Sequence, residues 1–404
     1  MKDNLLYTFS NNELHFGLSK KNLLSLTQNY KGPAYVYDLG FIGRQVDLYF
    51  QNLPAQAKIF YAVKANANAE ILKYLKAKGV NVDVVSIGEI KCALEAGFNP
   101  KQIIFSGVGK TAIEIKFAIE KKIHQINIES ISELKRVVQI ATELQKKIDV
   151  AVRINPDISV DTHPYISTGL KENKFGLEIG QLDEFAQVLK AQKFVSWKGL
   201  SIHLGSQIFD VEPLGAGVQT LLEMANFYKA QFPELTRIDL GGGLGIDYHS
   251  FDFEREQKIM KAYGQMVSDV LKGTSFEIMV EPGRSLVGHA GVLITQIQYI
   301  KKNKHKTFVI VDSGMNHLIR PSLYQAYHQI VPLKNYPDLG FQCDVVGPIC
   351  ETSDFFARNY QLPFCQEGDF LAICDTGAYG YSMASRYNQT ELPAEICLNA
   401  DKAF

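Results

Sequence analysis

The sequence predicts an α/β protein in which a TIM-like (β/α)₈ barrel is followed by a mainly β C-terminal domain that includes the N-terminal strand. The length of 404 residues suits a barrel of about 250 residues with a second domain. From residue 58 onward, short runs rich in Val and Ile alternate with helical segments. After residue 281, strand-like runs follow one another with few helices between them. We therefore expect the barrel at 33–285 and the β domain at 286–404 plus 1–32.

Eight strand-like runs supply the predicted barrel. The first five recur at a short and nearly regular spacing, as consecutive βα units do, and the later spacings lengthen as the loops grow. Eight parallel units close more naturally into a barrel than they extend as an open sheet. The runs are 58–63, 81–85, 102–105, 124–128, 149–154, 199–203, 236–240 and 275–280.

The segments between these strands carry helical patterns. Apolar residues recur at helical spacing in 68–78, and Gly79 follows as a natural C-terminal cap. Segment 88–96 likewise ends at Gly97. In the C-terminal part, strands are expected at 292–299, 306–312, 342–346 and 369–374.

Composition and charge narrow the class of function. Hydrophobic residues at 46% and a formal net charge of -1 give no electrostatic reason to expect nucleic acid or an anionic membrane as a partner. The sequence has no run of 18 apolar residues and no apolar leader, so we expect no membrane span and a cytoplasmic protein. Six cysteines form no C-x-x-C pair, and no metal-spaced Cys/His cluster, H-E-x-x-H or Walker A motif occurs. We expect no metal and a small-molecule partner.

Four short motifs each follow a predicted barrel strand, where barrel enzymes keep their chemistry. They are 61–66 (YAVKAN), 203–207 (HLGSQ), 241–245 (GGGLG) and 281–284 (EPGR). A lysine, an imidazole, a glycine-rich turn and an acidic residue are parts that a pyridoxal phosphate site requires. Each motif is weak alone, but together they predict this cofactor.

Each residue type has its own chemistry in such a site. The amine of Lys64 forms a Schiff base with the cofactor aldehyde, and His203 stacks on its ring. The glycine turn offers backbone amides to a phosphate, and it does not fit the G-x-G-x-x-G fingerprint because residue 246 is Ile. An acid such as Glu281 keeps the pyridine nitrogen protonated. Taken singly, these residues could equally be a strand-end lysine, a core histidine, a tight turn and a surface carboxylate.

Over nearly its whole length the sequence resembles the diaminopimelate decarboxylases. They belong to the alanine-racemase-like, fold type III group of pyridoxal phosphate decarboxylases, which also holds the ornithine and arginine decarboxylases. The resemblance rests on ordered motifs: 35–38 (YVYD), 61–66, Asn155 with Pro156, His163 with 166–169 (ISTG), 174–176 (KFG) and 377–379 (GAY). It implies a (β/α)₈ barrel followed by a β domain that includes the N-terminal strand.

Residue by residue, the resemblance implies a site shared between the two subunits of an obligate homodimer. The implied cofactor-binding residues are Lys64, His203, Ser206, Gly242, Gly243, Glu281, Arg284 and Tyr379, with Ser206 and the two glycines at the phosphate. The implied substrate-binding residues are Arg284, Arg320, Tyr324, Glu351 and Tyr379. The implied catalytic residues are Lys64, His203 and Cys350. Cys350 would donate a proton and Glu351 would bind the distal amine, both across the dimer interface.

Substrate choice follows from charge. A distal end with an ammonium and a carboxylate needs partners of both signs, and Glu351, Arg284 and Arg320 supply them. Because Arg284 belongs to a motif shared with ornithine decarboxylases, whose substrate has no distal carboxylate, Arg320 in 320–324 (RPSLY) is the better discriminator. We expect decarboxylation of meso-2,6-diaminopimelate to L-lysine and CO₂, the last step of lysine biosynthesis.

Two motifs depart from the family pattern. The thiol motif is 350–354 (CETSD) instead of C-E-S-G-D, and Ile87 stands where glycine is common.

Three other functions stay open. Decarboxylation of ornithine, arginine, lysine or a carboxylated polyamine would not need Arg320. A pyridoxal phosphate carrier without catalytic activity would lack the second domain, with its Cys350 and Tyr379. An amino-acid racemase would require a catalytic tyrosine in the β domain.

Overall fold

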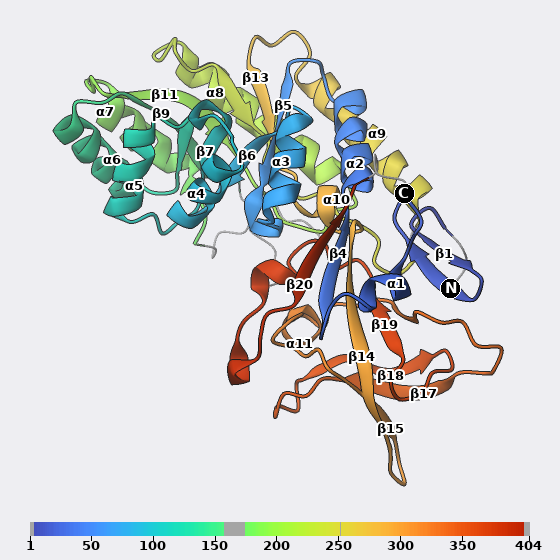
Figure 1. The fold of residues 1–404 in the computed structure, drawn as a ribbon. Helices are drawn as coiled ribbons and strands as arrows, with labels where there is room; N and C mark the ends of the chain where they lie inside the picture. Colours follow the sequence, from blue (N-terminus) through green and yellow to red (C-terminus); the bar gives the residue numbers. More distant parts are fainter. Residues whose placement is uncertain (1–3, 157–173, 251, 400–404) are drawn as a thin grey trace. The chain divides into compact units, whose positions relative to one another are not determined.

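The computed structural model describes residues 4–156, 174–250 and 252–399. The chain forms two compact units, which we describe one at a time (Figure 1). The barrel unit consists of Val46–Gly245 and Phe253–Gly283. The β unit consists of Met1–Gln45, Ile246–Asp252 and Arg284–Phe404. The domain boundaries expected from the sequence, 33–285 and 286–404 plus 1–32, stay predictions.

The barrel unit contains a closed ring of eight parallel strands in the described part of the chain. The ring order is β5, β6, β7, β8, β9, β11, β12 and β13, and β13 pairs with β5 to complete it. The strands are β5 (Ala57–Ala62), β6 (Asn81–Val84), β7 (Ile103–Phe105), β8 (Gln125–Ile128), β9 (Ile148–Asn155), β11 (Val195–Ser201), β12 (Arg237–Asp239) and β13 (Glu277–Val280). A short strand, β10 (Leu177–Glu178), adds to β9. The predicted barrel is confirmed, and each predicted run overlaps one strand of the ring.

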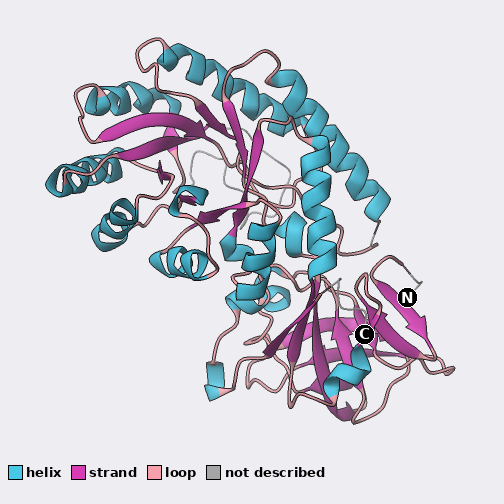
Figure 2. Ribbon diagram, turned by 45° about the horizontal axis from the view of Figure 1, so that its top comes forward, coloured by secondary structure: helices cyan, strands magenta, loops and turns pink. Residues whose placement is uncertain are grey.

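Helices cover the outside of this ring (Figure 2). Their starts follow ordinary capping rules: the Ser86 and Ser130 hydroxyls accept from the third backbone amide of the helix that each precedes. Gly79 and Gly97 take φ values of +80° and +89°, as expected for the glycines that end two helices. The helices are α2 (Leu39–Asn52), α3 (Ala69–Ala77), α4 (Ile87–Glu95), α5 (Ala112–Lys121), α6 (Ile131–Leu144), α7 (Leu182–Leu189), α8 (Glu212–Lys229) and α9 (Phe253–Val270).

The inside of the ring changes from apolar to polar side chains toward the carboxyl ends of the strands. Phe60, Ile104 and Met279 form a buried apolar cluster from β5, β7 and β13. Asp83 and Asp239, by contrast, are buried polar residues near the carboxyl ends of β6 and β12, and each is 1% exposed. Burying a carboxyl is costly without compensation, so these residues indicate a functional edge of the barrel.

One strand differs from its predicted bounds. β11 begins at Val195, whereas the predicted run begins at 199. A bulge between Trp197 and Gly199 interrupts the alternation of its side chains, so the sequence pattern did not reveal the first residues of the strand. It ends at Ser201, so His203 lies two residues beyond the strand instead of closing it. His203 therefore belongs to the loop that follows β11.

The β unit is built around β14 (Gly291–Lys302), which pairs antiparallel with β4 (Ala34–Asp38), β15 (Thr307–Val311) and β19 (Phe370–Ile373). The first and last strands of this sheet meet, because β4 also pairs in parallel with β20 (Ala394–Leu398), as the blue and red arrows of Figure 1 show. The other elements are β16 (Ile330–Pro332), β17 (Phe341–Val346), β18 (Phe355–Leu362), α10 (Arg284–Val287) and α11 (Arg320–Tyr324). All four strands predicted in this region are present.

The N-terminal residues join the β unit, as the predicted fold class requires. They form a small antiparallel sheet of β1 (Tyr7–Ser10), β2 (Glu13–Phe16) and β3 (Lys21–Asn22), followed by α1 (Leu23–Thr27). The Leu14 amide donates to the Leu333 carbonyl at 2.9 Å. The Asn335 amide donates to the Asn12 carbonyl at 2.8 Å.

Helix α9 passes α2 so closely that only glycine fits at the contact. A Cβ on Gly264 would overlap the carbonyl oxygen of Asn52. We expect Gly264→Ala to lower the free energy of unfolding by about 1–3 kcal/mol, measured by urea denaturation, because backbone must shift to relieve the overlap. Gly180→Ala is the matched control, since nothing lies within 4 Å of a Cβ there. Equal losses in the two variants would contradict this account of the contact.

Candidate active site

A cavity of about 310 Å³ lies at the carboxyl ends of the barrel strands. Lys64, His203 and Glu281 line it, and they come from the segments after β5, β11 and β13. The structure therefore brings together three predicted site residues that the sequence separates widely. The volume is at the lower end of the range of small-molecule pockets.

Lys64 lies in a tight turn directly after β5. This turn is a 3₁₀ segment, Val63–Ala65, in which Lys64 is exposed between two buried neighbours. The Tyr61 hydroxyl donates to the Asn66 carbonyl at 2.9 Å and braces the turn from beneath. The turn thus projects a lysine from an otherwise buried, braced backbone.

His203 is bonded to the glycine turn. The Gly242 amide donates to His203 Nδ1 at 3.2 Å. Because a backbone amide can only donate, Nδ1 must carry the lone pair, which leaves the ring proton on Nε2. Burial, reinforced by the charges of Arg153 and Lys64, lowers the pKa of His203 well below its usual value. The imidazole is therefore a flat and neutral group.

The turn 241–245 requires glycine because the backbone of neighbouring segments approaches it closely. A Cβ on Gly242 would overlap the Glu281 carbonyl oxygen, and one on Gly243 would lie 2.7 Å from the Gly205 carbonyl oxygen. Gly243 also has a φ of +126°, which favours glycine. The Ile208 amide donates to the Gly243 carbonyl at 2.9 Å, so the loop that carries Ser206 runs beside the turn. Bare backbone next to a serine suits a phosphate group.

Three carboxyl groups meet at the cavity, where Asp83 and Glu281 line the wall and Asp239 lies beside Glu281. Burial, and then the neighbouring Asp239, raises the pKa of Glu281 well above its usual value. Burial raises the pKa of Asp239 to about 6, and its Oδ1 accepts from the Gly241 amide at 3.0 Å. Burial, and then Glu281, raises the pKa of Asp83 well above its usual value. Burial therefore favours the protonated forms of these carboxyls, and a cationic ring nitrogen would favour the charged form of Glu281.

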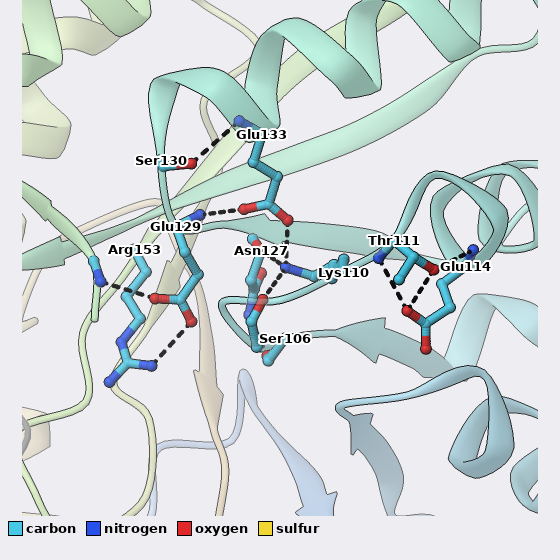
Figure 3. Close-up of polar contacts among 11 residues, drawn as sticks. Ser106, Lys110, Thr111, Glu114, Asn127, Glu129, Ser130, Glu133 and Arg153 are labelled. Carbon is cyan, nitrogen blue, oxygen red and sulfur yellow. Dashed lines mark hydrogen bonds and ion pairs between the residues drawn. The ribbon is translucent and has the colours of Figure 1, made fainter. Parts of the chain in front are cut away.

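A buried lysine ties the strands beneath this site together (Figure 3). Lys110 Nζ donates to the carbonyls of Gly107 and Asn127, each at 2.6 Å, and to Glu133 Oε1 at 2.7 Å. The second oxygen of Glu133 accepts from the Glu129 amide at 2.7 Å. The amine thus holds the segment after β7 and strand β8 against the first turn of α6.

The same network continues to the cavity wall. Arg153 Nη1 donates to Glu129 Oε1 at 3.1 Å, and the Gly176 amide donates to Glu129 Oε2 at 2.8 Å. The Arg153 guanidinium also lies 4.8 Å from the ring centre of Phe175. Arg153 and Phe175 both line the cavity, so the motif 174–176 contributes to the site. His163 and 166–169, which the resemblance also used, lie outside the described residues.

Sequence reasoning missed several residues at or next to the cavity. Asp83, Asn127 and Arg153 line it, and Asp239 lies beside Glu281; all four are at the carboxyl ends of barrel strands, and none was singled out. The available signal was a polar residue interrupting an apolar strand just before its end. That signal is weak in one sequence, because strand ends are often polar.

In the β unit, two buried arginines gather around a tyrosine. Arg284 is 8% exposed and donates through Nη1 to the Tyr248 hydroxyl at 2.8 Å. The Arg320 guanidinium is 4.7 Å from the centre of the Tyr248 ring. The Arg284 guanidinium is 4.9 Å from the Tyr379 ring centre, and Tyr324, at the end of α11, also interacts electrostatically with Arg284. The structure thus groups the predicted Arg284, Arg320, Tyr324 and Tyr379, and adds Tyr248, which the sequence had not indicated.

Arg320 carries a buried charge that has no acidic partner among the residues the structure describes. It is 5% exposed, and its polar contacts within the described residues are His328 and Tyr248, without any carboxylate at ion-pair distance. A buried cation is costly unless an anion compensates it. This position therefore suits an anionic group of a ligand.

Cys350 and Glu351 lie on a loop of the β unit and are both exposed in the single chain. Glu351 Oε1 accepts from the Tyr387 hydroxyl at 2.7 Å. Asp354 accepts from the backbone amides of Met315 and Ile349, each at 2.6 Å. The carboxylate of Asp354 therefore secures the loop, and the change from Ser-Gly to Thr-Ser at 352–353 leaves that support in place.

Known proteins resemble this chain in sequence over most of its length. A family model described as "Pyridoxal-dependent decarboxylase, pyridoxal binding domain" matches residues 39–288, which defines the chain as a pyridoxal-dependent decarboxylase. The diaminopimelate decarboxylase of Helicobacter pylori strain J99 is 43% identical over 386 residues, covering 94% of each chain. That of Aquifex aeolicus is 40% identical over 378 residues, covering 93% of this chain and 88% of the relative. The chain belongs to the diaminopimelate decarboxylase family.

A solved structure agrees with this assignment. The crystal structure of diaminopimelate decarboxylase from Helicobacter pylori complexed with L-lysine matches with a TM-score of 0.89 and 42% identity, covering 94% of this chain and 95% of that one. The fold and the pyridoxal-binding class predicted from the sequence are thereby confirmed. The roles of individual site residues stay predictions.

The Lys110 network supports the site from outside the cavity. We expect Lys110→Met to lower the free energy of unfolding by about 3–5 kcal/mol, because Glu133 would remain buried without its cation. Adding Glu133→Gln to the same protein should recover part of this loss. Lys135→Met is the control, since Lys135 pairs with Glu184 at 3.3 Å on the surface and should change stability by less than about 0.5 kcal/mol. Urea denaturation would measure the free energy of unfolding of all three variants. An unchanged free energy of unfolding in Lys110→Met would contradict the role of this network.

Proposed function

We propose that the protein is a pyridoxal-phosphate-dependent enzyme that decarboxylates meso-2,6-diaminopimelate to L-lysine and CO₂. Membership of the diaminopimelate decarboxylase family supports the reaction. The assignment of the substrate rests on one observation: the buried guanidinium of Arg320 has no carboxylate partner in the described β unit. Ornithine, arginine and lysine have no distal carboxylate to offer it.

The residues around the barrel cavity fit the cofactor. Lys64 would hold its aldehyde carbon, the turn at Gly242 and Gly243 with Ser206 would hold its phosphate, and Glu281 would bind its ring nitrogen. Three observations support this fit: the glycine turn without side chains beside Ser206, the neutral His203 and the raised pKa of the Glu281 carboxyl. When bound, pyridoxal phosphate accepts the electrons that the departing carboxylate leaves behind.

The chain's own residues would orient the substrate and move protons. Arg320 and Arg284 would bind the distal carboxylate, and Glu351 would bind the distal ammonium. The thiol of Cys350 would supply the proton that replaces CO₂ at the reacting carbon. Tyr379, which lies against Arg284, would border both the cofactor and the substrate.

We propose further that the working enzyme is a homodimer in which one subunit completes the other's site. Cys350 and Glu351 are exposed in the single chain, which supports a position where a second copy reaches them. Leu323 and Tyr327, which flank the end of α11, are also exposed, at 43% and 37%, and would suit burial against a partner. In the parts of the chain that are described, no helix combines the length and apolarity needed to cross a bilayer. The cytoplasmic location expected from the sequence stays a prediction.

The substrate assignment is tested by CO₂ and L-lysine release from protein supplied with pyridoxal phosphate. We expect turnover of meso-diaminopimelate and none above background with ornithine, arginine or lysine. Arg320→Met should raise KM for meso-diaminopimelate roughly 10- to 100-fold, the effect of losing one charge-assisted hydrogen bond. Arg136→Met, at an exposed position on α6, is the control and should leave KM unchanged. Turnover of the basic amino acids alone would overturn the role given to Arg320.

The shared site is tested by mixing two inactive variants. Lys64→Ala and Cys350→Ala should each be nearly inactive as homodimers. After the subunits are exchanged, roughly a quarter of all sites should regain both residues, since half of randomly formed dimers are mixed and each has one intact site. Sedimentation would verify that both variants dimerise. Mixed dimers that stay inactive would show that Cys350 does not serve a partner's site.

A further inference from the structure

His328 lies directly against Arg320 in the β unit. It is 1% exposed and follows α11 in the chain. Its Nε2 is 2.8 Å from Arg320 Nη1, and its Nδ1 is 2.8 Å from the carbonyl oxygen of Cys374. The imidazole therefore joins the arginine to the end of strand β19.

The two contacts determine the protonation of the ring. A guanidinium can only donate, so Nε2 must be the acceptor, and a carbonyl oxygen can only accept, so Nδ1 must carry the proton. Burial, and then the charge of Arg320, lowers the pKa of His328 well below its usual value. The ring is consequently a neutral acceptor whose two nitrogens have assigned roles.

The support behind His328 is a hydrogen-bonded part of the sheet. The Cys374 amide donates to the Gln329 carbonyl at 2.9 Å, next to the antiparallel pairing of β16 with β19. Tyr248 contacts both side chains: its ring centre lies 5.3 Å from that of His328 and 4.7 Å from the Arg320 guanidinium. The guanidinium is thus held at one edge by the imidazole and on one face by the phenol.

A neutral acceptor at this position has a consequence that an acid would not have. A carboxylate at 328 would orient Arg320 equally well, but it would also neutralise the guanidinium and compete with an anionic ligand. The imidazole orients the planar fork and leaves its full positive charge for another anion. Pre-organisation of this kind lowers the entropy lost when a carboxylate binds the remaining N–H groups.

We propose that His328 is a positioning residue for substrate specificity, which holds Arg320 in the orientation that binds the distal carboxylate of the substrate. This inference rests on the proposed function for the identity of that carboxylate. In this role His328 would not contact the substrate itself and would act only through Arg320.

The test compares three replacements at 328 in the holoenzyme with meso-diaminopimelate. His328→Phe keeps an aromatic ring but removes the acceptor, and we expect it to raise KM about tenfold while kcat changes little, since Arg320 loses one hydrogen bond. His328→Gln offers an amide oxygen to Arg320 and should recover most of the KM. His328→Glu should raise KM at least as much as His328→Phe, because it pairs with the arginine charge. His305→Phe, at an exposed turn of the same unit, is the control and should leave KM unchanged.

A double-mutant cycle separates this role from general damage. In an Arg320→Met background, His328→Phe should cause no further rise in KM, because the histidine acts through the arginine. A persistent rise there, or an unchanged KM in the folded single variant, would overturn the proposal. If His328→Phe fails to fold, the order of KM between His328→Gln and His328→Glu decides, and equal values would overturn it as well.

The outcomes also distinguish this inference from the proposed function. A raised KM in Arg320→Met with a normal KM in His328→Phe would remove only the role of His328. An unchanged KM in Arg320→Met would remove the carboxylate contact of Arg320, and the inference about His328 with it.

Discussion

The closure of the parallel strand ring is the constraint on which the rest of the barrel unit depends. β13 pairs with β5 although 219 residues separate Lys58 from Glu277, the two residues whose side chains form an ion pair across that junction at 2.9 Å. The Ala62 amide then donates to the Pro282 carbonyl at 3.0 Å, which brings the turn that carries Lys64 beside the loop that carries Glu281. Every strand of the ring runs in the same direction, so their polar ends share one edge.

The two units handle buried charge in opposite ways. In the barrel unit, Asp83, Asp239 and Glu281 lie close together, and burial favours protons over charges on them. In the β unit, Arg284 and Arg320 lie beside aromatic rings and a neutral histidine, and Arg320 has no acidic neighbour among the described residues. Burying these groups costs free energy, and a ligand that brings the opposite charge to each site would offset that cost. Sites that are poorly compensated in this way are typical of binding positions rather than of structural cores.

Sequence reasoning succeeded where the information is local. Apolar runs of strand length, glycines after helices and four motifs at strand ends predicted the barrel and its cofactor. It was weaker for the β unit, where β16 and β18 lie at the two ends of the sheet path and β20 pairs only with β4. Such strands bury one side incompletely, so their apolar pattern is faint; the residues of β18 alternate irregularly between buried and exposed. In β11, a central strand of the ring, the bulge between Trp197 and Gly199 interrupts the alternation of side chains, so the start of that strand was missed.

By itself, the sequence determined the order of strands and helices, the class of cofactor and the residue types available at the strand ends, because these depend on periodicity and on chemistry within a few neighbouring positions. Tertiary structure alone decided which polar residues meet. Asp239 reaches Glu281 through the pairing of β12 with β13, and Lys110 reaches Glu133 through the packing around β7 and β8. His328 acquires its tautomer from the Cys374 carbonyl, 46 residues further along the chain. Contacts between distant positions depend on how the chain closes on itself, and no local pattern records that closure.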